Sequence, residues 1–217
     1  MKTIVMDTSN AYLVIGLYED DQCIDKYQAD GNRRQSEYAL THLDEMLKKH
    51  HWEVLNVDEM IITIGPGSYT GQRVALTIAK TLAAISKIKI KAVSSLHGYA
   101  GASKAISVID ARSKKIFVGV YEHNQAIIDD QIMLIDDFAN FKEQYPDFQV
   151  IGDSDLVGIN KVKLDLSDCI YQPKSIRLIN IFFSPQHLLN NEEQDYQYFD
   201  NNQHFYQLDK YNHLNRV

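Results

Sequence analysis

Two short polar turns carry the side chains best suited to bind a nucleotide or a metal ion. Asp7, Thr8 and Ser9 follow an apolar stretch near the N-terminus, and Asp110 and Arg112 follow a similar stretch in the second half. A carboxylate can hold a metal ion, and an arginine can pair with a phosphate. Neither turn has the Asp-x-Gly form that lets backbone approach a phosphate closely. We interpret these five residues as candidates for a nucleotide-facing site, with an ordinary ion pair as an equal alternative for Arg112.

A glycine-rich loop is the second candidate for binding an anion. It joins an expected strand to an expected helix and contains Gly65, Gly67, Ser68, Thr70, Gly71 and Arg73. Free N–H groups at the start of a helix attract anions. The P-loop pattern fails, because its second glycine would fall on Thr70 when counted from Gly65 and on Gln72 when counted from Gly67. A tight turn that lets the helix pack closely explains the glycines equally well.

Other catalytic groups lack partners at a useful spacing. The eight histidines form no H-x-x-x-H or H-E-x-x-H pattern. The chain has no G-x-S-x-G elbow, and Cys23 and Cys169 are far apart with no base close in sequence. The sequence therefore predicts no metal site and no complete catalytic constellation.

Charge and composition describe an ordinary globular chain that is acidic. Its 217 residues contain 22 Lys and Arg against 29 Asp and Glu, a net charge of −7. An acidic chain binds nucleic acid poorly by itself, so any contact with RNA requires a partner. Two distant cysteines, and the lack of a signal peptide or a long apolar run, predict a reduced, cytoplasmic protein that does not enter a membrane.

An internal duplication is the most informative feature of the sequence. Residues 5–28 align without a gap with residues 108–131, and the alignment pairs Asp7 with Asp110, Gly16 with Gly119, and Tyr18 with Tyr121. We interpret the chain as two copies of one unit, residues 1–100 and 101–217, with the boundary near residues 98–104. Two such units with an Asp in the first turn resemble the actin-like superfamily of sugar kinases and Hsp70, in which a nucleotide lies between the halves.

Apolar periodicity places these motifs on strands and helices. In the first half we expect strands over residues 3–6 and 12–18, a third strand after the polar turn 19–22, and strands over 60–64 and 89–93. We expect helices over 36–49 and 72–86 and a third helix that starts at residues 94–96. In the second half we expect strands over 106–109, 116–121 and 149–151, and helices over 136–144 and 175–183. The polar stretch 190–203 is expected at the surface. The order βββαβαβα predicts an α/β fold with mixed sheets and flanking helices.

The helices over 36–49 and 72–86 carry more apolar residues than one covered face needs. We expect the surplus to form an interface with another subunit. The residues assigned to this interface are Leu40, Leu43, Leu47, Ala75, Ile78, Ala79 and Leu82. Burial of the same residues in the domain's own core is the alternative.

Several stretches together resemble the TsaB (YeaZ) family. They are Met6–Ser9, Ser36-Glu37, Gly65–Arg73, Val93–Leu96 and Ile109–Arg112. The resemblance covers about residues 1–122 and is weak beyond them. One departure is Gln35, where the family commonly has a histidine.

The resemblance implies a duplicated, two-lobed actin-like fold (ASKHA, RNase H-like) and a role in tRNA modification. Such a protein would be the non-catalytic scaffold of a complex with a TsaD-like catalytic subunit and a TsaE-like ATPase. That complex transfers threonylcarbamoyl onto the adenosine beside the anticodon of tRNAs that read ANN codons. The resemblance further implies contact with tRNA only within the complex and a homodimer when the chain is alone. It implies no intrinsic cofactor, with ATP or ADP at a joint site with the partner.

The alternative function is an independent ATP-dependent enzyme of the actin-like group. It would use Asp7 and Asp110 around a nucleotide–metal complex. The missing glycines of both turns favour the scaffold over this enzyme.

Overall fold

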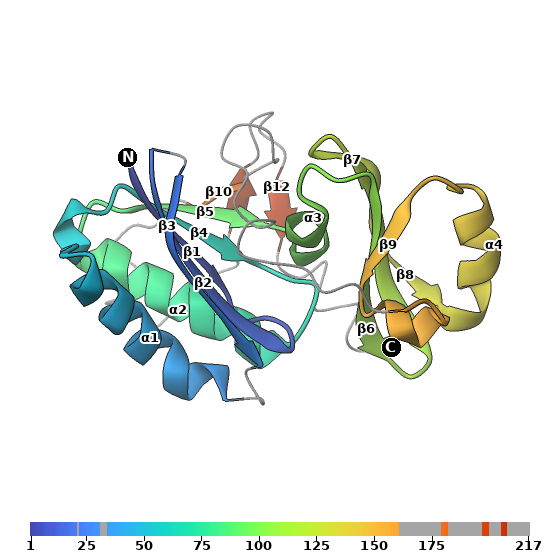
Figure 1. Ribbon diagram of the computed structural model, residues 1–217, viewed down its shortest axis with the longest axis horizontal. Coiled ribbons are helices and arrows are strands. Elements are labelled where there is room, and N and C mark those ends of the chain that lie inside the picture. Colours follow the sequence, from blue (N-terminus) through green and yellow to red (C-terminus); the bar gives the residue numbers. More distant parts are fainter. Residues whose placement is uncertain (21, 31–33, 161–178, 182–196, 200–204, 208–217) are drawn as a thin grey trace.

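Two β-sheets in two lobes form the chain, with helices packed against them (Figure 1). The computed structural model describes residues 1–20, 22–30, 34–160, 179–181, 197–199 and 205–207. The elements of the first lobe are β1 (Lys2–Asp7), β2 (Tyr12–Glu19), β3 (Gln22–Asp30), α1 (Gln35–Lys49), η1 (Val54–Asn56), β4 (Glu59–Thr63), α2 (Tyr69–Ile85), β5 (Lys89–Val93) and α3 (Ser95–Ala100). Those of the second are β6 (Ala105–Arg112), β7 (Lys115–Glu122), β8 (Gln125–Leu134), η2 (Ile135–Asp137), α4 (Phe138–Glu143), β9 (Gln149–Gly152) and η3 (Ser154–Val157).

The two sheets repeat one topology, which confirms the predicted α/β duplication. In the first sheet β1 pairs antiparallel with β2, β2 antiparallel with β3, and β1 parallel with β4. In the second sheet β6, β7, β8 and β9 repeat these three pairings in the same order. Both sheets are therefore mixed, and their first strands carry an aspartate at the last residue of β1 (Asp7) and two residues before the end of β6 (Asp110).

The last described strands do not follow the predicted division into residues 1–100 and 101–217. They are β10 (Ile179–Ile181), β11 (Gln197–Phe199) and β12 (Phe205–Gln207). β10 pairs antiparallel with β5, so these strands extend the first sheet. The helix predicted over 175–183 is wrong for 179–181, and its other residues lie outside the described part. So does most of the polar stretch 190–203.

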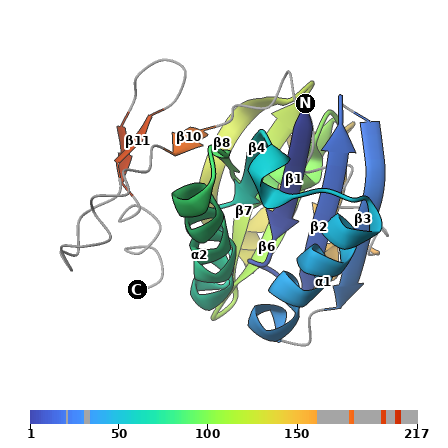
Figure 2. The same ribbon diagram turned by 90° about the vertical axis from the view of Figure 1, so that its left-hand side faces the viewer.

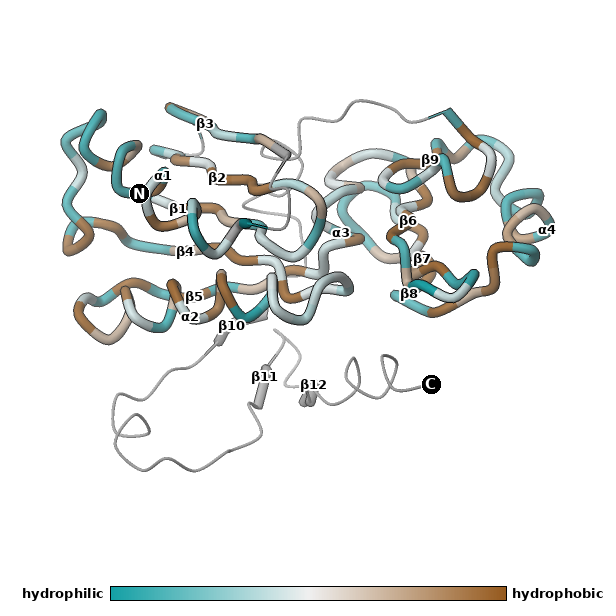
Figure 3. Tube along the Cα trace, turned by 90° about the horizontal axis from the view of Figure 1, so that it is seen from below, coloured by the Kyte–Doolittle hydropathy of each residue, from teal (hydrophilic) through white to brown (hydrophobic). Residues whose placement is uncertain are grey.

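Helices α1 and α2 lie side by side over one face of the first sheet (Figure 2). Their buried side chains meet those of the inner strands, which are apolar along much of their length (Figure 3). α2 begins at Tyr69, earlier than predicted, because the Ser68 side chain accepts a hydrogen bond from the Gly71 N–H at 3.2 Å. This cap satisfies one of the free donors of the first helical turn.

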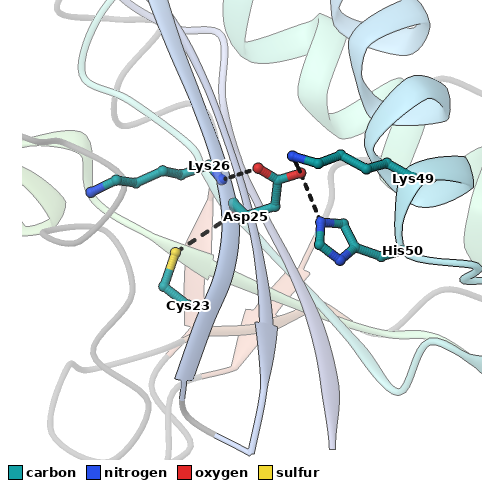
Figure 4. A network of polar contacts seen from close by, with 5 residues as sticks. All are labelled: Cys23, Asp25, Lys26, Lys49 and His50. Atoms are coloured by element: carbon teal, nitrogen blue, oxygen red, sulfur yellow. Dashed lines mark hydrogen bonds and ion pairs between the residues drawn. The ribbon is translucent and has the colours of Figure 1, made fainter.

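The C-terminal end of α1 is fastened to strand β3 by a small polar network (Figure 4). One oxygen of Asp25 lies 2.9 Å from both Lys49 Nζ and His50 Nε2. Burial acts to raise the pKa of Asp25, but the hydrogen bonds from Lys49 and His50 outweigh it, and this pKa is lowered. The network holds α1 against the edge of the first sheet.

The other face of the first sheet packs against the second lobe through α3. This short helix is buried along its whole length, and Leu96 is 0% exposed. Around it gathers an inter-lobe core of Val5, Val14, Tyr18, Ile61, Val93, Leu96, Tyr99, Ala100, Ala105, Ile109, Phe117, Tyr121 and Ile151. The space between the sheets at α3 is therefore filled with apolar side chains.

The repeated Gly-x-Tyr pattern serves this inter-lobe core. A Cβ on Gly16 would lie 2.8 Å from the ring of Tyr18, and one on Gly119 would overlap the ring and hydroxyl of Tyr121. Each glycine makes room for the tyrosine two residues later on the same face of its strand.

No helix in the described ranges reaches the length and apolar character required to cross a bilayer.

Replacing Leu96 with alanine is expected to lower the free energy of unfolding by about 2–5 kcal/mol, because it leaves a cavity between the lobes. Leu55→Ala is the matched control, since that side chain is 68% exposed and its loss should change stability by less than about 0.5 kcal/mol. Urea-induced unfolding followed by circular dichroism measures both. An equal loss in the two variants would show that α3 is not a packing centre.

Candidate functional site

Asp7, at the end of β1, is the centre of a buried polar cluster. Its Oδ1 accepts hydrogen bonds from the Ser9 N–H at 2.7 Å, the Ser9 hydroxyl at 2.7 Å and the Thr63 hydroxyl at 2.6 Å. The Ser9 hydroxyl also lies 2.9 Å from Ser95 Oγ. The cluster thus joins the end of β1, the end of β4 and the start of α3.

Burial sets the protonation behaviour of this cluster. Asp7 has no exposed surface, and burial raises its pKa even though the hydrogen bonds from Thr63 and Ser9 act to lower it. Burial likewise raises the pKa of Tyr99 well above its usual range, with further contributions from the charges of Asp7 and Asp153.

The glycine-rich loop packs directly on the Asp7 turn. The Ser68 N–H donates to the Ser9 carbonyl at 2.6 Å. The Thr8 hydroxyl donates to the Gly71 carbonyl at 2.6 Å and accepts from the Ala75 N–H at 3.1 Å. A Cβ on Gly71 would overlap the Thr8 carbonyl, so only glycine fits this approach of helix to turn.

This packing does not fit a phosphate cradle formed by the loop. The N–H groups of Ser68 and Gly71 already have acceptors within the chain, and Gly67, with φ +153°, would place a Cβ 2.5 Å from the Ser9 carbonyl oxygen. Gly65, with φ +98°, lies against the Gln72 side chain. The tight-turn reading of the glycines is the one that these contacts favour.

The outer residues of the same loop face solvent. Thr70 and Arg73 are exposed on the first turns of α2. The Arg73 guanidinium lies over the Tyr69 ring, 5.3 Å from its centroid, and Tyr69 is itself 49% exposed. These side chains belong to the outer surface of the helix pair and not to the Asp7 cluster.

The second aspartate turn repeats one hydrogen bond of the first, although Arg112 has a φ of +66° and no residue of the first turn has a positive φ. Asp110 Oδ1 accepts a hydrogen bond from the Arg112 N–H at 2.7 Å, the distance found for the Ser9 N–H on Asp7. The Asp110 N–H donates to Asp153 Oδ2 at 3.0 Å. Arg112 is exposed, with its Nη1 3.6 Å from Asp110 Oδ2, so the ion pair weighed for it from the sequence is present.

Most side chains predicted for the partner interface face inward. Leu43, Leu47, Ala75, Ala79 and Leu82 belong to the core between the helices and the first sheet. Leu40 is 56% exposed and Ile78 is partly buried. A charge placed at Leu43 or Ala79 would disrupt this core and could not report on partner binding.

Exposed apolar residues that the sequence analysis missed lie on the same helices. They are Tyr38 on α1 and Tyr69 and Ile85 on α2. Helical spacing could have found them, because each lies away from the buried stripe defined by Ala39 and Leu43 or by Ala75 and Ala79. With Leu40, they define what we call the helix-pair surface.

A polar contact between the lobes was also missed. The Ser94 hydroxyl donates to Asp130 Oδ2 at 2.5 Å, and the Tyr121 hydroxyl donates to the other oxygen of Asp130. The His97 ring stacks on Tyr121 with 4.7 Å between centroids. Asp130 of β8 is thereby joined to the start of α3.

Within the described ranges, His, Cys, Asp and Glu form no group that could hold a metal ion.

Replacing Gly71 with alanine is expected to lower the free energy of unfolding by about 1–3 kcal/mol, because the new methyl group overlaps the Thr8 carbonyl. Alanine would otherwise favour a helix by about 1 kcal/mol over glycine. Thr70→Ala, one residue earlier and exposed, is the control. A Gly71→Ala protein as stable as the parent in urea would contradict the tight packing.

Asp7→Asn tests the raised pKa of the buried carboxyl. Because the pKa of Asp7 is raised in the folded state, its titration stabilises the fold fully below the ordinary pKa of 3.8. This stabilisation is lost as the pH rises through the pKa that Asp7 has in the folded state. Asparagine does not titrate in this range. The stability of the parent relative to Asp7→Asn should therefore fall as the pH rises from about 4. Urea unfolding of both proteins over a pH series measures the difference in their free energies of unfolding. If the parent instead became more stable relative to Asp7→Asn as the pH rises, the pKa of Asp7 would be lowered in the folded state.

Comparison with known proteins places this arrangement in a family. The family model for TsaD, tRNA N6-adenosine threonylcarbamoyltransferase, matches residues 29–149. The chain is 31% identical over 154 residues to the tRNA threonylcarbamoyladenosine biosynthesis protein TsaB of Bacillus subtilis, which covers 66% of this chain and 67% of that protein. It is 23% identical to the Escherichia coli protein of the same name, covering 58% of this chain and 57% of that protein.

Solved structures show the same fold. YeaZ from Pseudomonas aeruginosa superposes with a TM-score of 0.57 at 21% identity, over 62% of this chain and 68% of that chain. The fold is thus the duplicated, two-lobed actin-like fold that the sequence predicted. Sequence identity, the matching family model and the shared fold agree, and they confirm the predicted resemblance: the chain belongs to the TsaB (YeaZ) family.

Proposed function

We propose that this chain is a non-catalytic scaffold subunit in the biosynthesis of threonylcarbamoyladenosine in tRNA. The curated relatives carry the name of this process. The observation that carries the scaffold role is the internal bonding of the Asp7 turn and the glycine-rich loop. Asp7 Oδ1 is here bonded to Ser9 and Thr63, and the Gly71 carbonyl of the loop is bonded to Thr8.

The proposed partner is a TsaD-like catalytic subunit that docks on the helix-pair surface. Tyr38, Leu40, Tyr69 and Ile85 are large apolar or aromatic side chains, each at least 41% exposed, on two adjacent helices. Aromatic anchors of this kind carry much of the binding energy of protein interfaces. A homodimer through the same surface is the proposed state of the chain alone.

RNA reaches this chain only within the complex in this proposal. A net charge of −7 opposes binding to a polyanion, so the partner supplies the cationic surface. A TsaE-like ATPase completes the assembly. The chain holds no nucleotide by itself, and ATP or ADP binds at a joint surface formed with the catalytic subunit.

Leu40→Glu is expected to weaken binding to the TsaD-like subunit of the same genome at least tenfold, because it replaces an exposed apolar side chain of the proposed contact with a charge. Leu55→Glu is the matched control, since Leu55 is also exposed but lies in η1. Titration calorimetry measures both affinities, and thermal unfolding checks that both variants remain folded. Native affinity in Leu40→Glu would remove the helix-pair surface from the proposal.

The alternative enzyme is tested on the isolated chain. Magnesium-dependent ATP turnover that disappears in Asp7→Ala would replace the scaffold with an ATP-dependent enzyme. The scaffold proposal expects no such turnover and a roughly stoichiometric actin-fold partner when the tagged chain is captured from its own cells.

A further inference from the structure

Two arginine–tyrosine stacks mark the first turns of α1 and α2. The Arg34 guanidinium lies 5.2 Å from the centroid of the Tyr38 ring, and the Arg73 guanidinium lies 5.3 Å from that of Tyr69. Arg73 Nη1 also lies 3.5 Å from the Tyr69 hydroxyl. Stacking on an aromatic ring restricts a long flexible side chain to one region of space.

The two stacks differ in charge balance. Arg34 is paired with Glu37, whose Oε2 lies 2.6 Å from Nη2. Arg112, far from both helices in the sequence, pairs with Asp110. Of these three arginines of the described ranges, only Arg73 has no carboxylate of the described residues within ion-pair distance.

The helices around the stacks show the same contrast. Each carboxylate of α1 has a basic neighbour: Glu37 has Arg34, Asp44 has Lys48 at 2.6 Å, and Glu45 has the imidazole of His42 at 3.2 Å. α2 contains no Asp or Glu, so no carboxylate of its own helix balances Arg73 in a chain that is acidic overall.

We infer that Arg73 is the electrostatic anchor of the helix-pair surface and pairs with a carboxylate of the catalytic subunit. An exposed guanidinium that stacks on Tyr69 and pairs with no carboxylate of the described residues is complementary to a carboxylate brought by a partner, which it can bind through two parallel hydrogen bonds. Arg73 lies one turn from Tyr69, so the ion pair would adjoin the apolar contact. This inference rests on the proposed function and names the chemistry that the partner must present.

The experiment compares Arg73→Ala with Arg34→Ala in the full chain. Both variants remove a guanidinium stacked on a tyrosine, but of the two only Arg34 has an ion pair with a carboxylate among the described residues. Affinity for the purified TsaD-like subunit should fall at least tenfold in Arg73→Ala and further in Arg73→Glu, and less than threefold in Arg34→Ala. The difference between the parent and Arg73→Ala should shrink as sodium chloride is raised from about 50 to 500 mM, because salt screens an accessible ion pair.

Three results would overturn the inference. Equal affinity of Arg73→Ala and the parent for the catalytic subunit would show that no carboxylate meets Arg73. Equal losses of affinity in Arg73→Ala and Arg34→Ala would assign the effect to the arginine–tyrosine stacks and not to an ion pair of the Arg73 guanidinium with the subunit. Unchanged affinity for the subunit, with weaker binding of total tRNA by the assembled complex, would assign Arg73 to a phosphate. Failure of the parent chain to bind the subunit would instead reject the proposed function.

Discussion

The carboxylate of Asp7, buried without exposed surface at the end of β1, constrains much of the surrounding structure. A buried carboxylate needs hydrogen-bond donors, and it draws them from its own turn and from the end of β4. The Ser9 hydroxyl that serves Asp7 also meets Ser95, which begins α3. The position of the inter-lobe helix thus depends on an interaction inside the first lobe.

Both lobes have an aspartate that accepts a hydrogen bond within its own turn, but the surroundings of the two turns differ. Asp7 and Asp110 each accept a hydrogen bond from the N–H two residues later, and each lies near the end of the first strand of its sheet. In the first lobe the glycine-rich loop covers the turn. In the second lobe the turn carries the exposed Arg112, and the Asp110 N–H donates to Asp153 in the loop after β9. The aspartate turn of the first lobe is therefore covered by packing, whereas that of the second lobe carries an exposed side chain.

Periodicity and the internal repeat made much of the fold predictable. The shared Asp, Gly and Tyr positions gave the duplication because each has a local physical role that survives in both copies. The start of α2 was predicted late, since its first turn depends on a cap from Ser68. Strand β10 could not be found from the sequence, because only pairing with the distant β5 makes it a strand.

The sequence was sufficient to predict the Asp7 turn, but not the exposed residues of α1 and α2. Asp7, Thr8 and Ser9 stood out by residue type and position, but their hydrogen-bond partners on β4, α2 and α3 are known only from the fold. Apolar spacing on the two helices identified the stripe that the sheet covers, so it selected Leu43, Ala75 and Ala79 in place of the exposed residues. The contact of Asp130 with Ser94 gave no sequence signal, because the two residues lie on separate lobes.

The absence of a side chain at Gly71 has a mechanical consequence. Because the start of α2 touches the backbone of the Asp7 turn, the helix cannot slide or rotate without moving Thr8 and Ser9. Ser9 is bonded to the start of α3, and α3 is packed against the second sheet. A subunit held on α2 would therefore find the second lobe at a fixed distance and angle. The chain would act as a rigid spacer whose geometry is set by one missing methyl group.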